Sequence, residues 1–155
     1  MPSTSLVGHT IPVPPTDDYY DLDSFSRRIS TNNPAWQIWF DRGLVWCYGF
    51  NHVEGAKSFR QALAHDPTCA MAYWGIAYAS GPNYNKAWGI FDRMDLETSM
   101  QTCYQASRRA DKLAHPSEGA TTTPEEKAIA RAIKARYPVV VRAKNNRRMP
   151  STAEM

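Results

Sequence analysis

The sequence predicts an all-α protein made of antiparallel helical hairpins, a short solenoid of about five helices. Apolar residues recur at helical spacing in several separate segments, and proline or glycine interrupts the chain between them. No stretch alternates apolar and polar residues as a half-buried strand does. The chain has 155 residues, 43% of them hydrophobic and 12% aromatic, which is enough for one domain with a modest core.

Three regions are expected along the chain. Residues 1–33 form an irregular lead-in, residues 34–138 the helical domain, and residues 139–155 a basic, disordered tail without a helical pattern. Prolines discourage regular structure in the lead-in: Pro2, Pro12, Pro14 and Pro15. The acidic and aromatic run at 17–23 is expected either to lie on the surface of the domain, which is slightly favoured, or to belong to a free tail.

The first helix is expected over residues 35–49. Asn33 is a suitable N-cap, Pro34 fits the first turn, and Gly49 marks the end. Its apolar residues cover more than one face, so it requires neighbours on both sides.

The second helix is expected to start at Asn51 and to run to about Ala64. Glu54 lies three residues after Asn51, which is the spacing of a capping box. The Asp66-Pro67 pair then stops the helix.

A third helix is expected over 69–79 and is ended by Gly81-Pro82. A long connection over 81–95 follows, with a short helix at 87–92. The fourth helix is expected over 96–114.

The fifth helix is expected to begin after Thr123 as its cap and to end near Tyr137. Pro124 suits its first position. Glu125 and Glu126 suit its first turn, where the helix dipole favours acidic side chains.

The first hairpin carries a repeat signature. Small, aromatic and proline residues occupy seven fixed positions: Trp39, Gly43, Trp46, Gly55, Phe59, Ala62 and Pro67. This pattern resembles the tetratricopeptide repeat, whose period is about 34 residues. Glycines at Gly43 and Gly55 would let the paired helices approach, and the rings would fill the space between them. The second unit starts in register, because Tyr73 follows Trp39 at that period, but Ala77 and Ser80 then depart from the pattern.

The resemblance implies a scaffold that binds a protein or peptide partner in a groove lined by the first helix of each unit. The residues expected there are Arg42, Trp46, Gly49, Tyr78 and Asn83.

A narrower resemblance involves the segments at 49–52 (GFNH), 66–77 (DPTCAMAYWGIA) and 81–85 (GPNYN). These look like the opening of larger, mostly uncharacterised microbial and fungal tetratricopeptide proteins. The similarity covers about residues 35–138, so a truncated, non-functional fragment is an open alternative. An incomplete last unit predicts marginal stability or self-association through the uncapped end of the solenoid.

A second candidate site lies where the turn inside the first hairpin and the 81–95 connection would share an edge. The polar residues expected there are Asn51, His52, Glu54, Asn83, Tyr84 and Asn85. One interpretation is a pocket for a small ligand near His52 and Asn83, as part of a larger enzyme or binding protein. The other is that these residues only cap helices and hold turns. His52 and Cys69 should lie about 20 Å apart at opposite ends of one helix, so they should not act together.

No catalytic residue, cofactor or metal site is predicted. The histidines His9, His52, His65 and His115 lack ligand spacing, and the chain has neither a Gly-x-Ser-x-Gly elbow nor a phosphate-binding glycine loop. Cys47, Cys69 and Cys103 form no CxxC pair, and an odd count suits no disulfide framework.

The net charge of +3 comes from the tail, which contains four basic residues and one acidic residue: Arg142, Lys144, Arg147, Arg148 and Glu154. Four cations without interleaved aromatic residues do not predict nucleic-acid binding. The sequence has no run of about 18 apolar residues, so no membrane span is predicted, and no apolar leader is evident. A reducing, cytoplasmic location is therefore expected.

Overall fold

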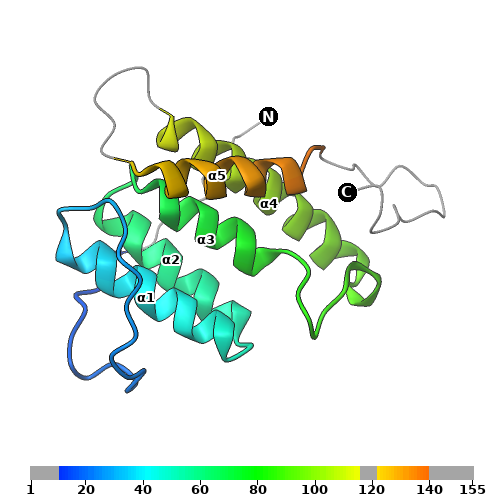
Figure 1. Ribbon diagram of the computed structural model, residues 1–155. Helices are drawn as coiled ribbons and strands as arrows, with labels where there is room; N and C mark the ends of the chain where they lie inside the picture. The colour runs from blue at the N-terminus through cyan, green and yellow to red at the C-terminus, as the bar shows by residue number, and fades with distance from the viewer. Residues whose placement is uncertain (1–10, 116–121, 140–155) are drawn as a thin grey trace.

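The computed structural model describes residues 11–115 and 122–139 and confirms the all-α fold (Figure 1). Five α-helices and one short 3-10 helix (η1) follow one another within these residues, and none of the described residues forms a strand. The elements are α1 (Pro34–Tyr48), α2 (His52–His65), α3 (Ala70–Ser80), η1 (Trp88–Ile90), α4 (Arg93–Ala114) and α5 (Pro124–Arg136). None of these helices is both long and apolar enough to cross a membrane.

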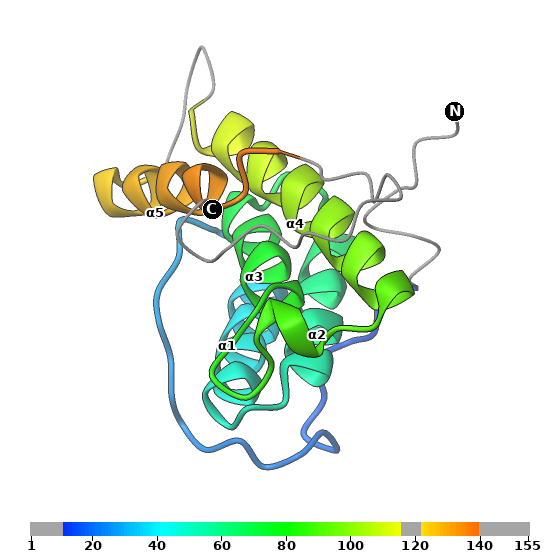
Figure 2. The same cartoon turned by 90° about the vertical axis from the view of Figure 1, so that its right-hand side faces the viewer.

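The helices pack as successive neighbours, with α3 at the centre of the molecule. Each helix contacts the next one in the chain, and α3 also contacts α1 and α5. Helices α1, α3 and α5 therefore form one layer, while α2 and α4 lie on its other side (Figure 2). This central position explains why eight of the eleven residues of α3 are buried.

The core is centred on Phe59 of α2, whose ring is fully buried between two glycines. A Cβ atom at Gly43 of α1, or at Gly75 of α3, would overlap this ring. The ring of Phe40 packs against Phe59 with centroids 5.6 Å apart. One aromatic side chain thus joins three helices, which is possible because both facing positions lack a side chain.

Helix α1 ends at its C-cap Gly49, as expected, but this glycine does not supply the left-handed conformation of the turn. Gly49 keeps an ordinary φ of −79°, and the left-handed residue is Phe50, with φ 63°. The amides of Phe50 and Asn51 donate to the carbonyls of Cys47 (3.1 Å) and Trp46 (2.8 Å). This pattern is the Schellman motif, in which a left-handed residue lets two late helical carbonyls find partners.

Only half of the expected capping box of α2 forms. The side chain of Asn51 accepts a hydrogen bond from the amide of Glu54 at 3.2 Å, as predicted. The amide of Asn51 is already bound to Trp46, so the Glu54 carboxylate pairs with Lys57 instead.

Helix α4 begins one turn before its apolar pattern does. The side chain of Asp92 accepts from the amide of Asp95 at 2.9 Å and so caps the helix. The first turn is exposed, and hydrophobic periodicity therefore gave no sign of it.

Thr123 caps helix α5 as expected, and with Glu126 it forms a full capping box. The Thr123 hydroxyl accepts from the amide of Glu126 at 3.2 Å, and the Glu126 carboxylate accepts from the amide of Thr123 at 2.9 Å. The helix ends at Arg136, followed by the buried ring of Tyr137.

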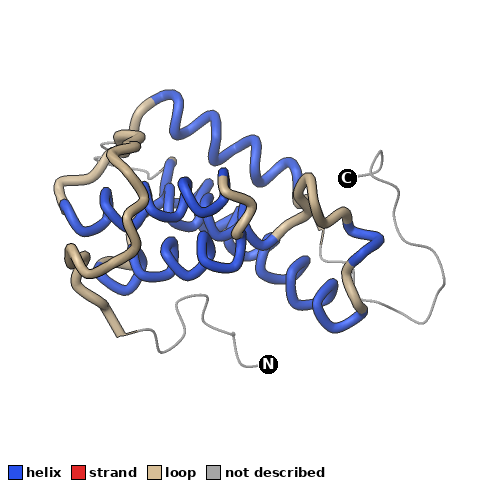
Figure 3. The backbone as a smooth tube through the Cα atoms, turned by 90° about the horizontal axis from the view of Figure 1, so that it is seen from below, coloured by secondary structure: helices blue, strands red, loops and turns tan. Residues whose placement is uncertain are grey.

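Residues 11–33, here called the N-terminal segment, pack on the helical domain. The segment passes from the side of α2, round α1, and up to the start of α5 (Figure 2). Figure 3 shows it as a tan tube that runs across the helices. The predicted tail lies outside the described residues, apart from Val139.

Candidate peptide-binding surface

The N-terminal segment contacts α1 through two arms that run in opposite directions. The outgoing arm (residues 11–22) advances from the middle of α1 toward its C-terminal end, and the return arm (residues 25–30) runs back. The turn between the arms brings Phe25 edge-on to Tyr48, with ring centroids 5.6 Å apart. A single helix thus holds two arms without helix or strand, and the outgoing arm turns where the amides of Thr16 and Tyr19 donate to the carbonyls of Pro14 and Thr16.

Side chains of α1 and α2 hold the outgoing arm by its main chain. The carbonyl of Val13 accepts from the indole Nε1 of Trp39 at 3.0 Å, and the Nε2 atom of His65 lies 3.0 Å from the same oxygen. The amide of Val13 donates to the side-chain oxygen of Gln61 at 2.9 Å. Farther along, the guanidinium of Arg42 donates to the carbonyl of Thr16 at 3.0 Å. These contacts recognise backbone atoms, which every non-proline residue supplies.

Tyr19 is the side chain of the outgoing arm that α1 recognises most fully. Its hydroxyl accepts from the indole Nε1 of Trp46 at 2.9 Å, and its ring packs edge-on to Trp39 at 5.2 Å. The guanidinium carbon of Arg42 lies 4.0 Å from the centroid of the Tyr19 ring and 4.8 Å from that of Trp39. This is a cation–π stack between two aromatic residues.

The stack changes the electrostatics of Arg42. Burial lowers the pKa of its guanidinium, while the neighbouring Tyr19 and Asp17 act in the opposite direction. A cation removed from water gains most from an acidic neighbour, so this position favours a chain that carries a carboxylate near its tyrosine.

The return arm is held by a second set of polar side chains on α1. The side-chain amide of Gln37 accepts from the amide of Ile29 at 3.0 Å and donates to the carbonyl of Arg27 at 2.8 Å. The carboxylate of Asp41 accepts from the amide of Arg27 at 2.9 Å and from the hydroxyl of Ser26 at 2.7 Å. Ile29, 5% exposed, is the one fully buried residue described in the segment.

The return arm ends at the buried carboxylate of Glu126, at the start of α5. Ser30 donates to this carboxylate through its amide, at 2.7 Å, and through its hydroxyl. With the amide of Thr123, three donors satisfy the one carboxylate. Sequence reasoning assigned Glu126 only to the helix dipole, because a partner 96 residues away leaves no local signal.

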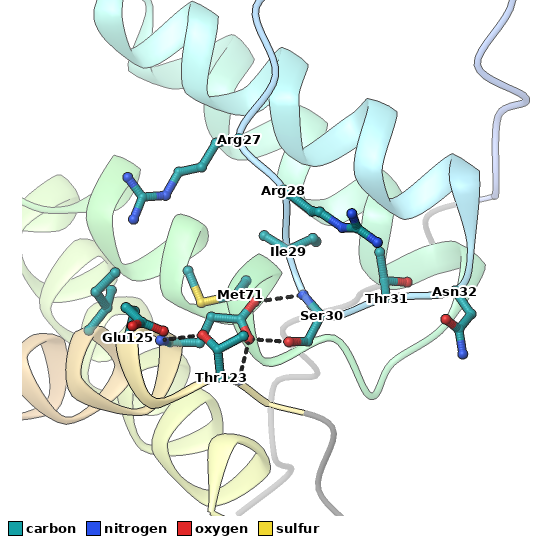
Figure 4. Close-up of a pocket in the computed structure, with 11 residues that line it drawn as sticks. Arg27, Arg28, Ile29, Ser30, Thr31, Asn32, Met71, Thr123 and Glu125 are labelled. Atoms are coloured by element: carbon teal, nitrogen blue, oxygen red, sulfur yellow. Dashed lines mark hydrogen bonds between the residues drawn. The ribbon is translucent and has the colours of Figure 1, made fainter.

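An open hollow of about 550 Å³ lies between the return arm, α3 and α5. Its lining is mixed, with Arg27, Met71, Glu125 and Ile129 among the residues around it. Arg27 extends toward the side of Glu125, whereas Arg28 points away from it (Figure 4). A hydrogen bond to its own backbone and one to Thr123 lower the pKa of Glu125. The hollow therefore presents a cation and an anion from different elements.

Two of the expected groove residues, Arg42 and Trp46, bind the chain's own outgoing arm. Tyr78 lies elsewhere, on α3, where its ring stacks on Trp74 with centroids 5.2 Å apart. Gly49 is exposed at the end of α1. The expected groove residues thus fall on two separate surfaces.

The residues expected to form a pocket at the loop edge are also not brought together. The ring of His52 lies 6.1 Å from that of Tyr78, and burial lowers the pKa of His52. The side-chain oxygen of Asn83 accepts from the amides of Asn85 and Lys86, at 2.9 and 3.1 Å, so it closes its own turn. Tyr84 is 98% exposed. No hydrogen bond joins His52 to Asn83 within the described residues.

The cysteines and histidines form no reactive cluster in the described part of the chain. Burial raises the pKa of Cys47, Cys69 and Cys103 to about 12, so each remains a thiol at neutral pH. Cys69 follows the far end of α2 from His52, as expected. No group of three His, Cys, Asp or Glu side chains in residues 11–115 and 122–139 is arranged to hold a metal ion.

Sequence reasoning missed the side chains that hold the main chain of the segment: Gln37, Asp41, Gln61 and His65. The available signal was the polar pair Gln37 and Asp41, one turn apart on α1. Comparison of the chain with protein-family models, curated proteins and solved structures finds no match.

Proposed function

We propose that this protein is a scaffold of the tetratricopeptide type that binds extended segments of partner proteins along the side formed by α1, α3 and α5. One observation carries the proposal: polar side chains of α1 hold an extended polypeptide by its main chain. Gln37 binds both the carbonyl of Arg27 and the amide of Ile29, as a neighbouring strand would. Recognition of an extended backbone by helical side chains is what such a scaffold requires.

The hollow beside the return arm supports the same function. It is open, it has polar and apolar walls, and it is bordered by α3 and α5. A partner segment running beside the return arm would place an acidic side chain against Arg27 and an apolar one against Met71 and Ile129. Three buried, protonated cysteines suit the reducing, cytoplasmic location proposed for this scaffold.

Selection of short random peptides on the full chain tests the proposal. Selected peptides are expected to be acidic and to lose about tenfold or more in affinity for Arg27→Glu, since the change reverses a charge at the hollow. Lys112→Glu is the matched control, because Lys112 is an exposed residue of α4 and does not line the hollow. The proposal fails if no peptide binds, or if both variants weaken binding equally.

A further inference from the structure

The outer face of α1 is covered by the outgoing arm but is not filled by it. The turn of the segment stands away from the helix and leaves an open hollow of about 570 Å³ beside Ile38, Arg42 and Val45. Ile38 remains 38% exposed although it faces this covered side. Protein interiors seldom leave such space between well-fitted surfaces, so the outgoing arm is an incomplete occupant of this face.

The outgoing arm is also attached lightly. Apart from the rings of Tyr19 and Tyr20, its contacts are hydrogen bonds between helical side chains and the main chain of Val13 and Thr16. Tyr20 packs edge-on to Trp46 at 5.4 Å but is 68% exposed. Prolines at 12, 14 and 15 carry no amide hydrogen, so Val13 is the donor that matches Gln61 in this stretch. Such contacts suit an exchangeable segment better than a structural core.

The return arm, by contrast, is anchored. Asp41, Gln37 and Glu126 bind it at three successive points, and Ile29 is buried. Release of the outgoing arm therefore leaves the return arm and its hollow in place.

From this contrast we infer that the outer face of α1 is a second binding site, for acidic segments that contain a tyrosine and follow the turned path of the outgoing arm, which occupies the site as an internal ligand. The bound segment defines the ligand class. A tyrosine hydroxyl meets Trp46, its ring stacks under Arg42, and a carboxylate two residues earlier lies near the same guanidinium. Main-chain contacts at Val13 and Thr16 leave the other side chains free to vary.

This inference shares with the proposed function the need for side chains of α1 to bind the main chain of another segment, but it concerns a different surface and partner chemistry. The internal ligand competes strongly, because a short tether gives it an effective concentration of about 1 mM. A partner would bind this face only with higher affinity than the outgoing arm, or after the arm is weakened.

The test uses a fluorescent peptide of residues 11–22 and the full chain. Wild type is expected to bind the peptide weakly. Tyr19→Ala in the full chain weakens the internal ligand and is expected to raise the affinity for the peptide by about tenfold or more. Adding Arg42→Gln to Tyr19→Ala is expected to abolish this gain, because it removes the cation above the tyrosine ring.

The control peptide carries Tyr19→Ala itself and is expected not to bind any of the three proteins. Helical circular dichroism checks that each variant is folded, and Tyr19→Phe in the full chain, which keeps the ring and loses only the hydroxyl, should give an intermediate gain. Equal binding of the peptide by wild type and by both folded Tyr19 variants would overturn the inference. If peptides selected for the hollow still bind in that case, the proposed function stands without the second site.

Discussion

Phe50 is the residue whose backbone conformation is hardest to explain by local chemistry. Its φ of 63° suits glycine, and a side chain there costs about 1–2 kcal/mol. A residue just before a helix cap often packs on the fourth residue of the helix, but that position is Gly55. The ring is 58% exposed, so packing regains little of the cost.

Replacing Phe50 with glycine is expected to stabilise the protein by about 0.5–1 kcal/mol, because relief of the left-handed strain exceeds the added freedom of the unfolded chain. Phe50→Ala is the matched control, since it removes the same ring and keeps the strained Cβ. Urea unfolding measures both variants. Equal stability of the two would show that the conformation at Phe50 carries no strain.

At the scale of the helices, the sequence predicted contacts between residues a few positions apart, but it did not predict contacts with distant segments. Asn33 and Thr123 were identified as caps because their partners lie within three residues. Gly43 was correctly expected to allow close packing of the next helix, and the residue that packs against it is Phe59. Arg42 and Trp46 stood out as binding residues, but their partners lie 26 and 27 residues away in an irregular segment, where no periodicity indicates contact.

The two glycines around Phe59 predict an unusual response to alanine. Alanine normally stabilises a helix by about 1 kcal/mol relative to glycine, but here its methyl group would overlap the ring. Gly43→Ala and Gly75→Ala are each expected to destabilise the fold by about 1–3 kcal/mol. Gly89→Ala is the control, because a methyl group added at Gly89 would meet no other atom within 4 Å. Thermal unfolding of all three checks the sign, and a stabilised Gly75 variant would mean that Phe59 moves freely.

At the scale of the whole molecule, burial is uneven along the solenoid. Helix α5 buries only Glu126, Ala130 and Ile133, whereas α3 buries eight residues. The salt bridge of Lys134 with Asp111 at 2.6 Å and the Ser30 contact add to its attachment. The exposed charged residues of α5 are Glu125, Arg131, Lys134 and Arg136. The self-association expected of an incomplete repeat stays a prediction.

Hydrogen exchange is expected to show α5 opening before α1 to α3, because it has the least buried surface to lose. Glu126→Gln should speed exchange in α5 and in the return arm together by about tenfold, since it weakens the acceptor of three hydrogen bonds. Glu125→Gln, one residue away and exposed, should leave both rates nearly unchanged. Faster exchange in α5 alone would contradict a mechanical link between the two elements.

The bond between Ser30 and Glu126 also bears on the order in which the protein is made. During synthesis, residues 11–80 can emerge and pack as three helices with the return arm already on α1, since Gln37 and Asp41 are near in sequence. Glu126, which supplies the carboxylate partner of Ser30, is translated 96 residues after Ser30 itself. At about 5–20 residues per second, this interval lasts several seconds. Until α5 has been made, the nascent chain therefore lacks the bonds that attach the Ser30 end of the return arm to Glu126.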